Sequence, residues 1–158
     1  IAFFDRGPVD GTRMEMGGSW SVYWYNGAIV SSEIARGLDV AELVPSEHLS
    51  QNEIDAAKTV RWNYLNAQGQ PKIEWPASFS LAKAYLDQLE RGRCLSASRV
   101  SAVRRELESA ERASGAARGQ ALQKLSSELD GDRANSCDKP KVDALKKAVN
   151  DLMSPVAM

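Results

Sequence analysis

The stretch Ser19–Glu33, with the sequence SWSVYWYNGAIVSSE, decides how the front of this 158-residue chain folds. Its first seven residues alternate between the two faces expected of a β-strand, because successive strand side chains point in opposite directions. Asn26-Gly27 follows at once, and this pair favours the positive φ angles of a type I′ turn. The stretch therefore predicts two antiparallel strands, Ser19–Tyr25 and Ala28–Glu33, joined as a hairpin.

Two further strands are predicted on either side of this hairpin. Arg36-Gly37 indicates a turn into a third strand, Leu38–Val44, and Ile1–Arg6 is a β-rich run that ends at a Gly-Pro turn signal. The expected product is an antiparallel meander of about three strands plus one separate edge strand. A meander this short does not bury its own faces, and an unpaired edge strand needs a partner.

The Ser19–Tyr25 strand carries aromatic side chains on both faces, which favours a central strand packed on both sides. The alternative is an exposed aromatic platform for sugar rings or a membrane surface. The candidate binding residues of that platform are Trp20, Tyr23, Trp24 and Tyr25.

The middle of the chain is predicted to hold one helix and an irregular connector. Ser50-Gln51-Asn52-Glu53 has the pattern of a capping box, and the helix is expected to run to about Tyr64. Asn66–Pro76 contains one glycine and two prolines, which is typical of a loop. We therefore divide the chain into a blade-like region, residues 1–76, and a helical region, residues 77–158.

The helical region contains four segments with a narrow apolar stripe opposite a charged face, the pattern of an up-down four-helix bundle. The segments are Ser78–Arg91, a second that follows the Ser96/Ser98 cap, a third that follows the break at Ala113-Ser114-Gly115 and ends at Asp130-Gly131-Asp132, and a fourth from the Asp138 cap. The predicted fold class is thus α+β, an antiparallel meander followed by a mainly α region.

The two cysteines lie in loops that this topology brings together. Cys94 falls between the first and second segments and Cys137 between the third and fourth, so both loops lie at the same end of an up-down bundle. A disulfide between them is expected, with buried free thiols as the alternative. A disulfide indicates an oxidising compartment, which favours a secreted, periplasmic or cell-surface protein.

Composition and charge argue against several function classes. The net charge of −1 gives no field that attracts nucleic acid or anionic lipid, and no apolar run is long enough for a membrane span. Residues 1–76 carry six Lys or Arg against ten Asp or Glu, so the front is acidic by four charges. The acidic stretch Asp130–Asp138 lacks the spacing of an EF-hand loop, which favours a turn over a cation site.

One hydrolase hypothesis remains open. His48 is the only histidine, and Ser31 or Ser32 is its candidate nucleophile. Ser46 and Ser50 lie near His48 in the sequence, but no nucleophile-elbow pattern surrounds either of them. We otherwise expect no catalytic residue, no cofactor and no metal ligand.

The front half resembles the last blade of secreted bacterial LVIVD-repeat β-propeller proteins. The resemblance lies in Gly17–Gly27 and Ser32–Val40, while Ile1–Asp5 and Gly37–Val40 are similar to the degenerate repeat core. A propeller needs several four-stranded blades, and this chain supplies about one. The resemblance implies that the rest of the propeller is absent or lies on another chain.

The back half is similar to FIMAH-type helical domains at the C-termini of extracellular bacterial proteins. The similar features are Ala84–Leu89, Leu107 with Ala110, and Ala121–Leu125. This resemblance implies an accessory or attachment module without catalytic residues. We therefore expect a noncatalytic exported module, the C-terminal part of a larger protein, whose partner is the missing propeller portion or a second copy. Carbohydrate or surface binding through the aromatic strand is the alternative.

Overall fold

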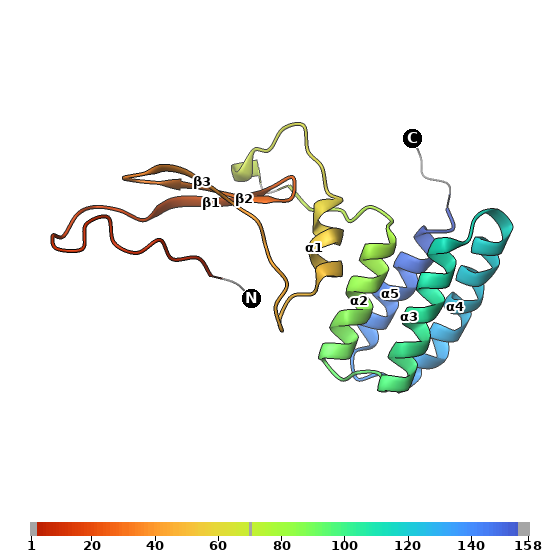
Figure 1. The fold of residues 1–158 in the computed structure, drawn as a ribbon. Helices are drawn as coiled ribbons and strands as arrows, with labels where there is room; N and C mark the ends of the chain where they lie inside the picture. Colours follow the sequence, from red (N-terminus) through yellow and green to blue (C-terminus); the bar gives the residue numbers. More distant parts are fainter. Residues whose placement is uncertain (1–2, 70, 155–158) are drawn as a thin grey trace.

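The computed structural model describes residues 3–69 and 71–154, and it contains a β-sheet, a short helix and a bundle of four helices (Figure 1). The sheet has three antiparallel strands in the order β1-β2-β3, namely β1 (Ser19–Tyr25), β2 (Ala28–Glu33) and β3 (Gly37–Ala41). The helices are α1 (Gln51–Lys58), the 3₁₀ turn η1 (Ala67–Gly69), α2 (Phe79–Arg91), α3 (Ala97–Arg112), α4 (Gly115–Asn135) and α5 (Lys139–Asp151). The predicted α+β class is confirmed.

The β1–β2 hairpin has the predicted turn. Asn26 and Gly27 have φ angles of 50° and 96°, and Tyr25 pairs with Ala28 directly across the turn. The register shifts between Ser19 and Ser21, which makes Trp20 the extra residue of a bulge.

The third strand is shorter than predicted and ends at Ala41 rather than Val44. Ala41 lies opposite Ile29, and only Ala28 separates Ile29 from the hairpin turn. The residues after Ala41 therefore have no stretch of β2 with which to pair.

The predicted edge strand Ile1–Arg6 is wrong for Phe3–Arg6, which form no strand, while Ile1 and Ala2 lie outside the described residues. The segment runs below the sheet in Figure 1. Arg6 Nη1 donates to the Asp39 carboxylate at 2.5 Å, and Phe3 and Phe4 help to line a hollow on the sheet. Side chains therefore hold this segment over a face of the sheet, whereas a strand needs backbone pairing at an edge.

Helix α1 begins at the predicted capping box but ends at Lys58 rather than near Tyr64. Thr59 Oγ1 donates to the Ala56 carbonyl at 2.7 Å, and the Val60 N–H turns back to Ala57. Two residues after Val60, the Trp62 backbone N–H donates to Asn26 Oδ1 at 2.8 Å. The tertiary contact with the hairpin replaces the helical hydrogen bond and stops the helix.

The four long helices form a closed ring, since α2 packs on α3 and α5, and α4 packs on the same two neighbours. Ser96 and Asp138 cap α3 and α5 as predicted, and Ser78, the predicted first residue of its segment, caps α2. Their apolar stripes meet in one core, whose fully buried side chains include Leu86, Leu89, Val100, Val103, Leu107, Leu122, Leu125, Leu129, Val142, Leu145 and Val149.

Helix α4 does not stop at Asp130-Gly131-Asp132 as predicted but continues to Asn135. Asp132 accepts from Arg99 Nε on α3 at 2.8 Å, and Asp130 forms an ion pair with Lys146 on α5. These acidic side chains bind neighbouring helices rather than their own backbone, so the turn that they were expected to form is absent.

Cys94 and Cys137 form a disulfide, with their Cα atoms 4.8 Å apart. The bridge joins the α2–α3 loop to the α4–α5 loop at one end of the bundle. Its presence agrees with the up-down topology inferred from the sequence.

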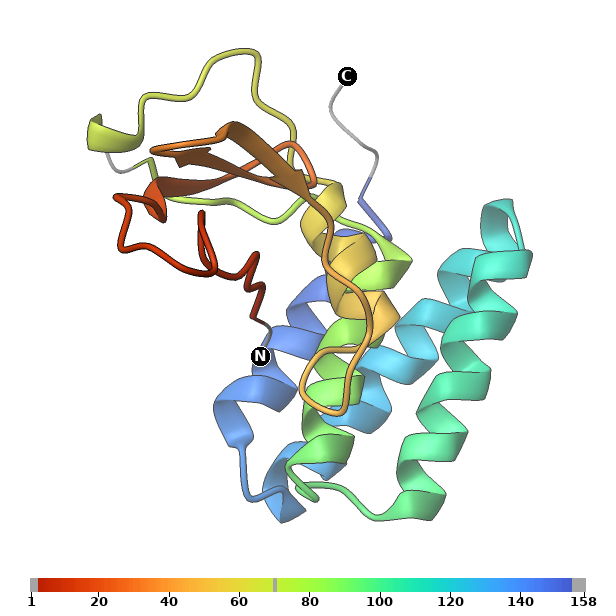
Figure 2. The same cartoon turned by 60° about the vertical axis from the view of Figure 1, so that its left-hand side comes forward.

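Helix α1 attaches the front of the chain to the bundle through a polar network against α2. Glu53 accepts hydrogen bonds from Arg91 at 2.8 Å and from Gln88 Nε2 at 2.8 Å. Asn52 donates to Asp87, which also accepts from Arg104 of α3 at 2.7 Å. Polar and charged side chains thus fix the position of α1, and Figure 2 shows this helix against the side of the bundle.

Candidate interaction surfaces of the sheet

The sheet differs from the bundle in that its apolar side chains are not buried. Among the described residues, all the fully buried apolar side chains lie at Ile54 or later in the chain. The buried side chains of the strands themselves are polar, namely Ser31 and Glu33. The bundle therefore has a complete core, whereas the sheet lacks one.

The alternation along β1 divides the sheet into two faces. The Val22 face carries Val22, Trp24, Ile29, Ser31, Asp39 and Ala41, and the Tyr23 face carries Tyr23, Tyr25, Val30, Leu38 and Val40. Val22 is 56% exposed and Val40 is 65% exposed, so apolar surface is open to solvent on both faces.

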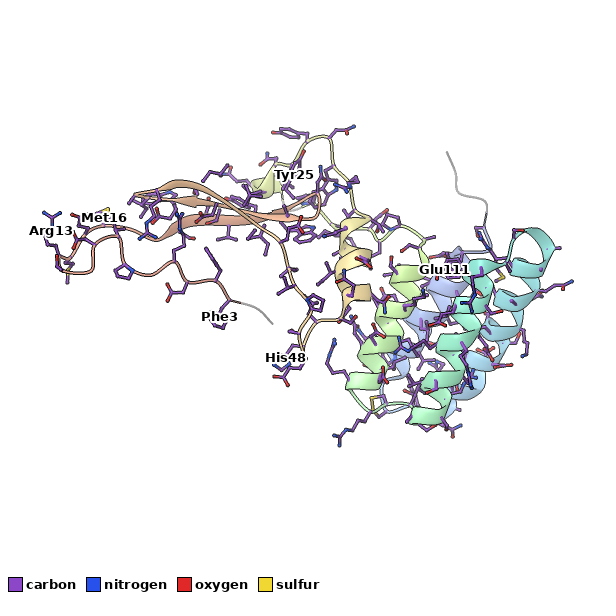
Figure 3. All side chains as sticks on the ribbon, viewed as in Figure 1. Phe3, Arg13, Met16, Tyr25, His48 and Glu111 are labelled. Carbon is purple, nitrogen blue, oxygen red and sulfur yellow. A yellow bond between two sulfur atoms is a disulfide. The ribbon has the colours of Figure 1, made fainter. Side chains whose placement is uncertain are left out.

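A hollow of about 450 Å³ lies on the Val22 face. Val22 and Ile29 form its floor, and Phe3, Phe4 and Val44 contribute apolar side chains from the segments on either side. Phe3 itself remains 95% exposed, so the first segment covers this face only partly. Figure 3 shows the Phe3 side chain at the outside of the molecule.

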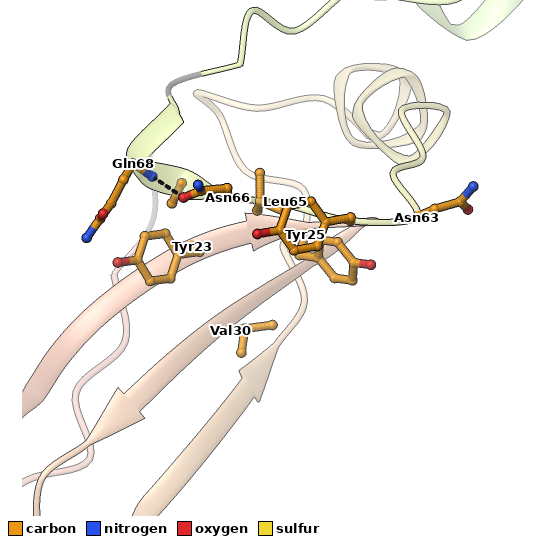
Figure 4. A pocket seen from close by; sticks show the side chains of 9 residues that line it. Tyr23, Tyr25, Val30, Asn63, Leu65, Asn66 and Gln68 are labelled. Atoms are coloured by element: carbon orange, nitrogen blue, oxygen red, sulfur yellow. Dashed lines mark hydrogen bonds between the residues drawn. The ribbon is translucent and has the colours of Figure 1, made fainter.

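A second hollow, of about 550 Å³, lies on the Tyr23 face. Its sheet side consists of Tyr23, Tyr25 and Val30. Residues 63–68 form the opposite side, and they belong to the connector, which in the structure is the segment between α1 and α2. Figure 4 shows the connector passing over the two tyrosines. Tyr25 is held in place because its hydroxyl donates to the Trp62 carbonyl at 3.0 Å.

Tyr23 and Tyr25 lie on one face of β1 and Trp24 on the other, as the alternation predicts, so the four candidate binding aromatics do not share one surface. Tyr23 and Tyr25 line the same hollow, but Trp24 belongs to the opposite face because it is the residue between them. Trp20 lies in the bulge and is 77% exposed. The connector residues Tyr64, Asn66 and Gln68, which sequence reasoning did not associate with the strand, complete the hollow.

The outer edge of β1 is a further open feature. β1 is an outer strand of the sheet, and no backbone hydrogen bond joins its outer edge to another strand in the described part of the chain. Its seven residues contain no charged residue and no proline, and these are residues that usually protect an edge. Only the bulge at Trp20 interrupts it.

Ser31, Ser32 and His48, the residues of the hydrolase hypothesis, each contact a side chain outside this set. The Ser31 hydroxyl pairs with Ser19 at 2.7 Å, and the Ser32 hydroxyl pairs with Ser21 at 2.9 Å. His48 lies on the loop between β3 and α1 (Figure 3), where Nε2 is 3.3 Å from the Glu47 carboxylate. Within residues 3–69 and 71–154, no hydrogen bond joins His48 to either serine.

Glu33, which sequence reasoning missed, organises the end of the sheet. Its carboxylate accepts from the backbone N–H groups of Gly18 at 2.6 Å, Arg36 at 2.5 Å and Ala35 at 3.0 Å. The Gly18 bond is the main cause that lowers the pKa of Glu33. Through these hydrogen bonds, Glu33 holds the loop before β1 against the turn after β2.

The acidic stretch at the end of α4 is used in helix contacts. Asp132 binds Arg99, and Asp138 caps α5 by accepting from the Lys141 N–H at 2.9 Å. In the part of the chain that the structure describes, no group of three His, Cys, Asp or Glu side chains has an arrangement that could hold a metal ion.

Comparison with known proteins gives no relative from which a function could be transferred. No protein-family model, no curated protein and no solved structure matches this chain significantly. None of the described helices is both long enough and apolar enough to cross a membrane.

Proposed function

We propose that this chain is a noncatalytic interaction module whose sheet docks against β structure of another polypeptide. The observation that carries the proposal is the contrast between the buried core of the bundle and the exposed apolar side chains of the sheet. Neighbouring apolar side chains that are exposed together are typical of interaction surfaces. The bundle serves as the folded support that presents the sheet.

Two features favour β structure as the partner. The open, uncharged edge of β1 offers a row of backbone donors and acceptors, which only an extended strand satisfies along its length. When a partner strand pairs with this edge, side chains of the same partner can pack into the hollow on the Val22 face. The resemblance to a propeller blade supports this choice, because a three-stranded meander is one strand short of a blade.

The charges favour the remaining blades of a propeller-type protein over a second copy as the natural partner. The acidic front of one copy would face the acidic front of another, which weakens self-association. We therefore favour a different β polypeptide, with a second copy as a weaker substitute at high concentration. The disulfide supports an exported location, secreted or periplasmic.

Light scattering over a concentration series, at high salt to screen the charges, tests the proposal with a second copy as the β partner. The wild-type chain should associate, and its sheet should bind the apolar dye anilinonaphthalene sulfonate. Val22→Asp should reduce both signals, whereas Ser127→Asp, on an exposed face of α4, should change neither. A chain that stays monomeric and binds no dye would overturn the proposal.

A further inference from the structure

The hollow on the Tyr23 face has a different chemistry from the docking surface on the Val22 face. Its lining residues are Tyr23, Tyr25, Val30, Asn63, Tyr64, Leu65, Asn66, Ala67 and Gln68. None of these described lining residues carries a charge. An anionic or cationic ligand would find no opposite charge there, so the hollow suits a neutral ligand.

The sheet side of the hollow provides aromatic surface. Tyr23 is 46% exposed, so a large part of its ring is open to a ligand, and Val30 extends the apolar floor beside it. Tyr25 is held by its hydrogen bond to Trp62, so it loses little side-chain entropy when a ligand binds. Aromatic rings have a negative face, against which the C–H groups of a sugar ring pack.

The connector side of the hollow provides carboxamides. Asn66 Oδ1 accepts from the Gln68 backbone N–H at 3.1 Å, which orients the Asn66 amide, and Figure 4 shows both residues near the Tyr23 ring. A carboxamide offers N–H donors and a carbonyl acceptor together. Sugar hydroxyl groups also donate and accept, so the two kinds of group match.

We propose that this hollow binds a neutral oligosaccharide, with a sugar ring on Tyr23 and its hydroxyl groups on Asn66 and Gln68. The proposal is independent of the docking role, because the hollow and the Val22 face lie on opposite sides of the sheet. It differs from a platform of all four strand aromatics, since Trp20 and Trp24 take no part. A proline-rich peptide is the rival ligand for an aromatic groove, and the two carboxamides favour the sugar.

The test titrates the full chain with cellohexaose, xylohexaose and mannohexaose, using isothermal calorimetry and intrinsic fluorescence. At least one hexasaccharide should bind the wild-type chain. Tyr23→Ala should weaken that binding about tenfold, while Tyr23→Phe should keep it because the ring face is retained. Trp20→Ala, a change of similar size on the same strand, should leave binding unchanged.

The connector provides a second test that does not alter the sheet. The double variant Asn66→Ala/Gln68→Ala should weaken hexasaccharide binding about fivefold or more, with the helical signal of the bundle unchanged. Three results would each overturn the proposal: no hexasaccharide binds at millimolar concentration, the double variant binds as tightly as wild type, or a proline-rich peptide binds in the hollow and the sugars do not.

Discussion

Asn26 and Trp62 form a reciprocal pair of hydrogen bonds that joins the hairpin turn to the segment after α1. Asn26 Nδ2 donates to the Trp62 carbonyl at 2.9 Å, and the Trp62 N–H donates to Asn26 Oδ1 at 2.8 Å. Arg61 Nη1 donates a further hydrogen bond to the Asn26 carbonyl at 2.7 Å. This pair connects the sheet, which has no buried apolar core, to the helix that packs on the bundle.

Replacement of Asn26 should therefore loosen the sheet without unfolding the bundle. Asn26→Gly keeps the positive φ of the turn and removes only the side-chain bonds, at an expected cost of about 1–2 kcal/mol to the front of the chain. Asn26→Ala loses the bonds and adds backbone strain, so its cost should be larger. Hydrogen exchange of the β1 and β2 amides measures both, and equal protection in all three proteins would contradict the role of the pair.

Alanine substitutions at Gly27 and Gly37 distinguish the cost of backbone strain from the cost of steric contact. Both have positive φ, 96° and 93°, but a Cβ on Gly27 would lie 3.0 Å from Lys58 Cγ, whereas a Cβ on Gly37 meets nothing within 4 Å. Each change to alanine should cost about 1 kcal/mol from strain, and Gly27→Ala should cost more because Lys58 must move. Exchange protection of the sheet amides compares them, and a larger loss for Gly37→Ala would refute this account.

Glu53 should make stability depend on pH in the acid range. Burial of its carboxyl raises the pKa, but the bonds from Arg91, Ser50 and Gln88 outweigh burial and lower the pKa to about 2 from the ordinary 4.5. Because the folded pKa is the lower one, the stabilisation is complete above about pH 4.5 and is lost as the pH falls toward 2.

The variant Glu53→Gln should reduce the free energy of unfolding by about 2 kcal/mol at neutral pH, since it removes the charge that accepts these bonds. Its difference from wild type should shrink as the pH falls below 4.5, measured by urea unfolding followed by circular dichroism. Asp55→Asn, an exposed change on the same helix, should cost only a few tenths of a kcal/mol at every pH. A pH-independent difference for Glu53→Gln would rule out the linkage.

The disulfide should contribute substantially to the stability of the bundle. Cys94 and Cys137 are 43 residues apart, and closing a loop of that length stabilises the folded state by about 4 kcal/mol in the chain-entropy treatment. The double variant Cys94→Ser/Cys137→Ser should unfold at a lower urea concentration by a corresponding amount. Reduction of the wild-type chain should produce a similar shift, and addition of a reductant to the double variant should produce none.

The sequence predicted the starts of the elements better than their ends. Ser50, Ser96 and Asp138 each cap a helix as expected, and each accepts a hydrogen bond from a backbone N–H three residues away. Ser78 caps α2 in the same way. Such bonds depend on a few neighbouring residues, so a local pattern is enough to recognise them. The Asn26-Gly27 turn was recognised for the same reason.

The errors arose where a distant residue competed for a local group. Helix α1 ends early because the Trp62 N–H donates to Asn26 instead of to a helical carbonyl. Helix α4 continues past Asp132 because the Asp132 carboxylate accepts from Arg99 and so does not form the expected turn. Arg6 likewise holds the first segment on Asp39. Neither partner in these pairs is visible from the sequence around the other, since they are at least 33 residues apart.

The sequence alone determined the class of fold, the helix caps, the hairpin and the cysteine pairing, because local hydrogen bonds and apolar periodicity specify them. The tertiary structure alone decided which surfaces remain open. It placed Asn66 and Gln68 over the tyrosines, and it buried the apolar stripes of the helices but not those of the strands. The physical reason is that burial depends on which elements pack together, and contacts between residues far apart in the chain settle that packing.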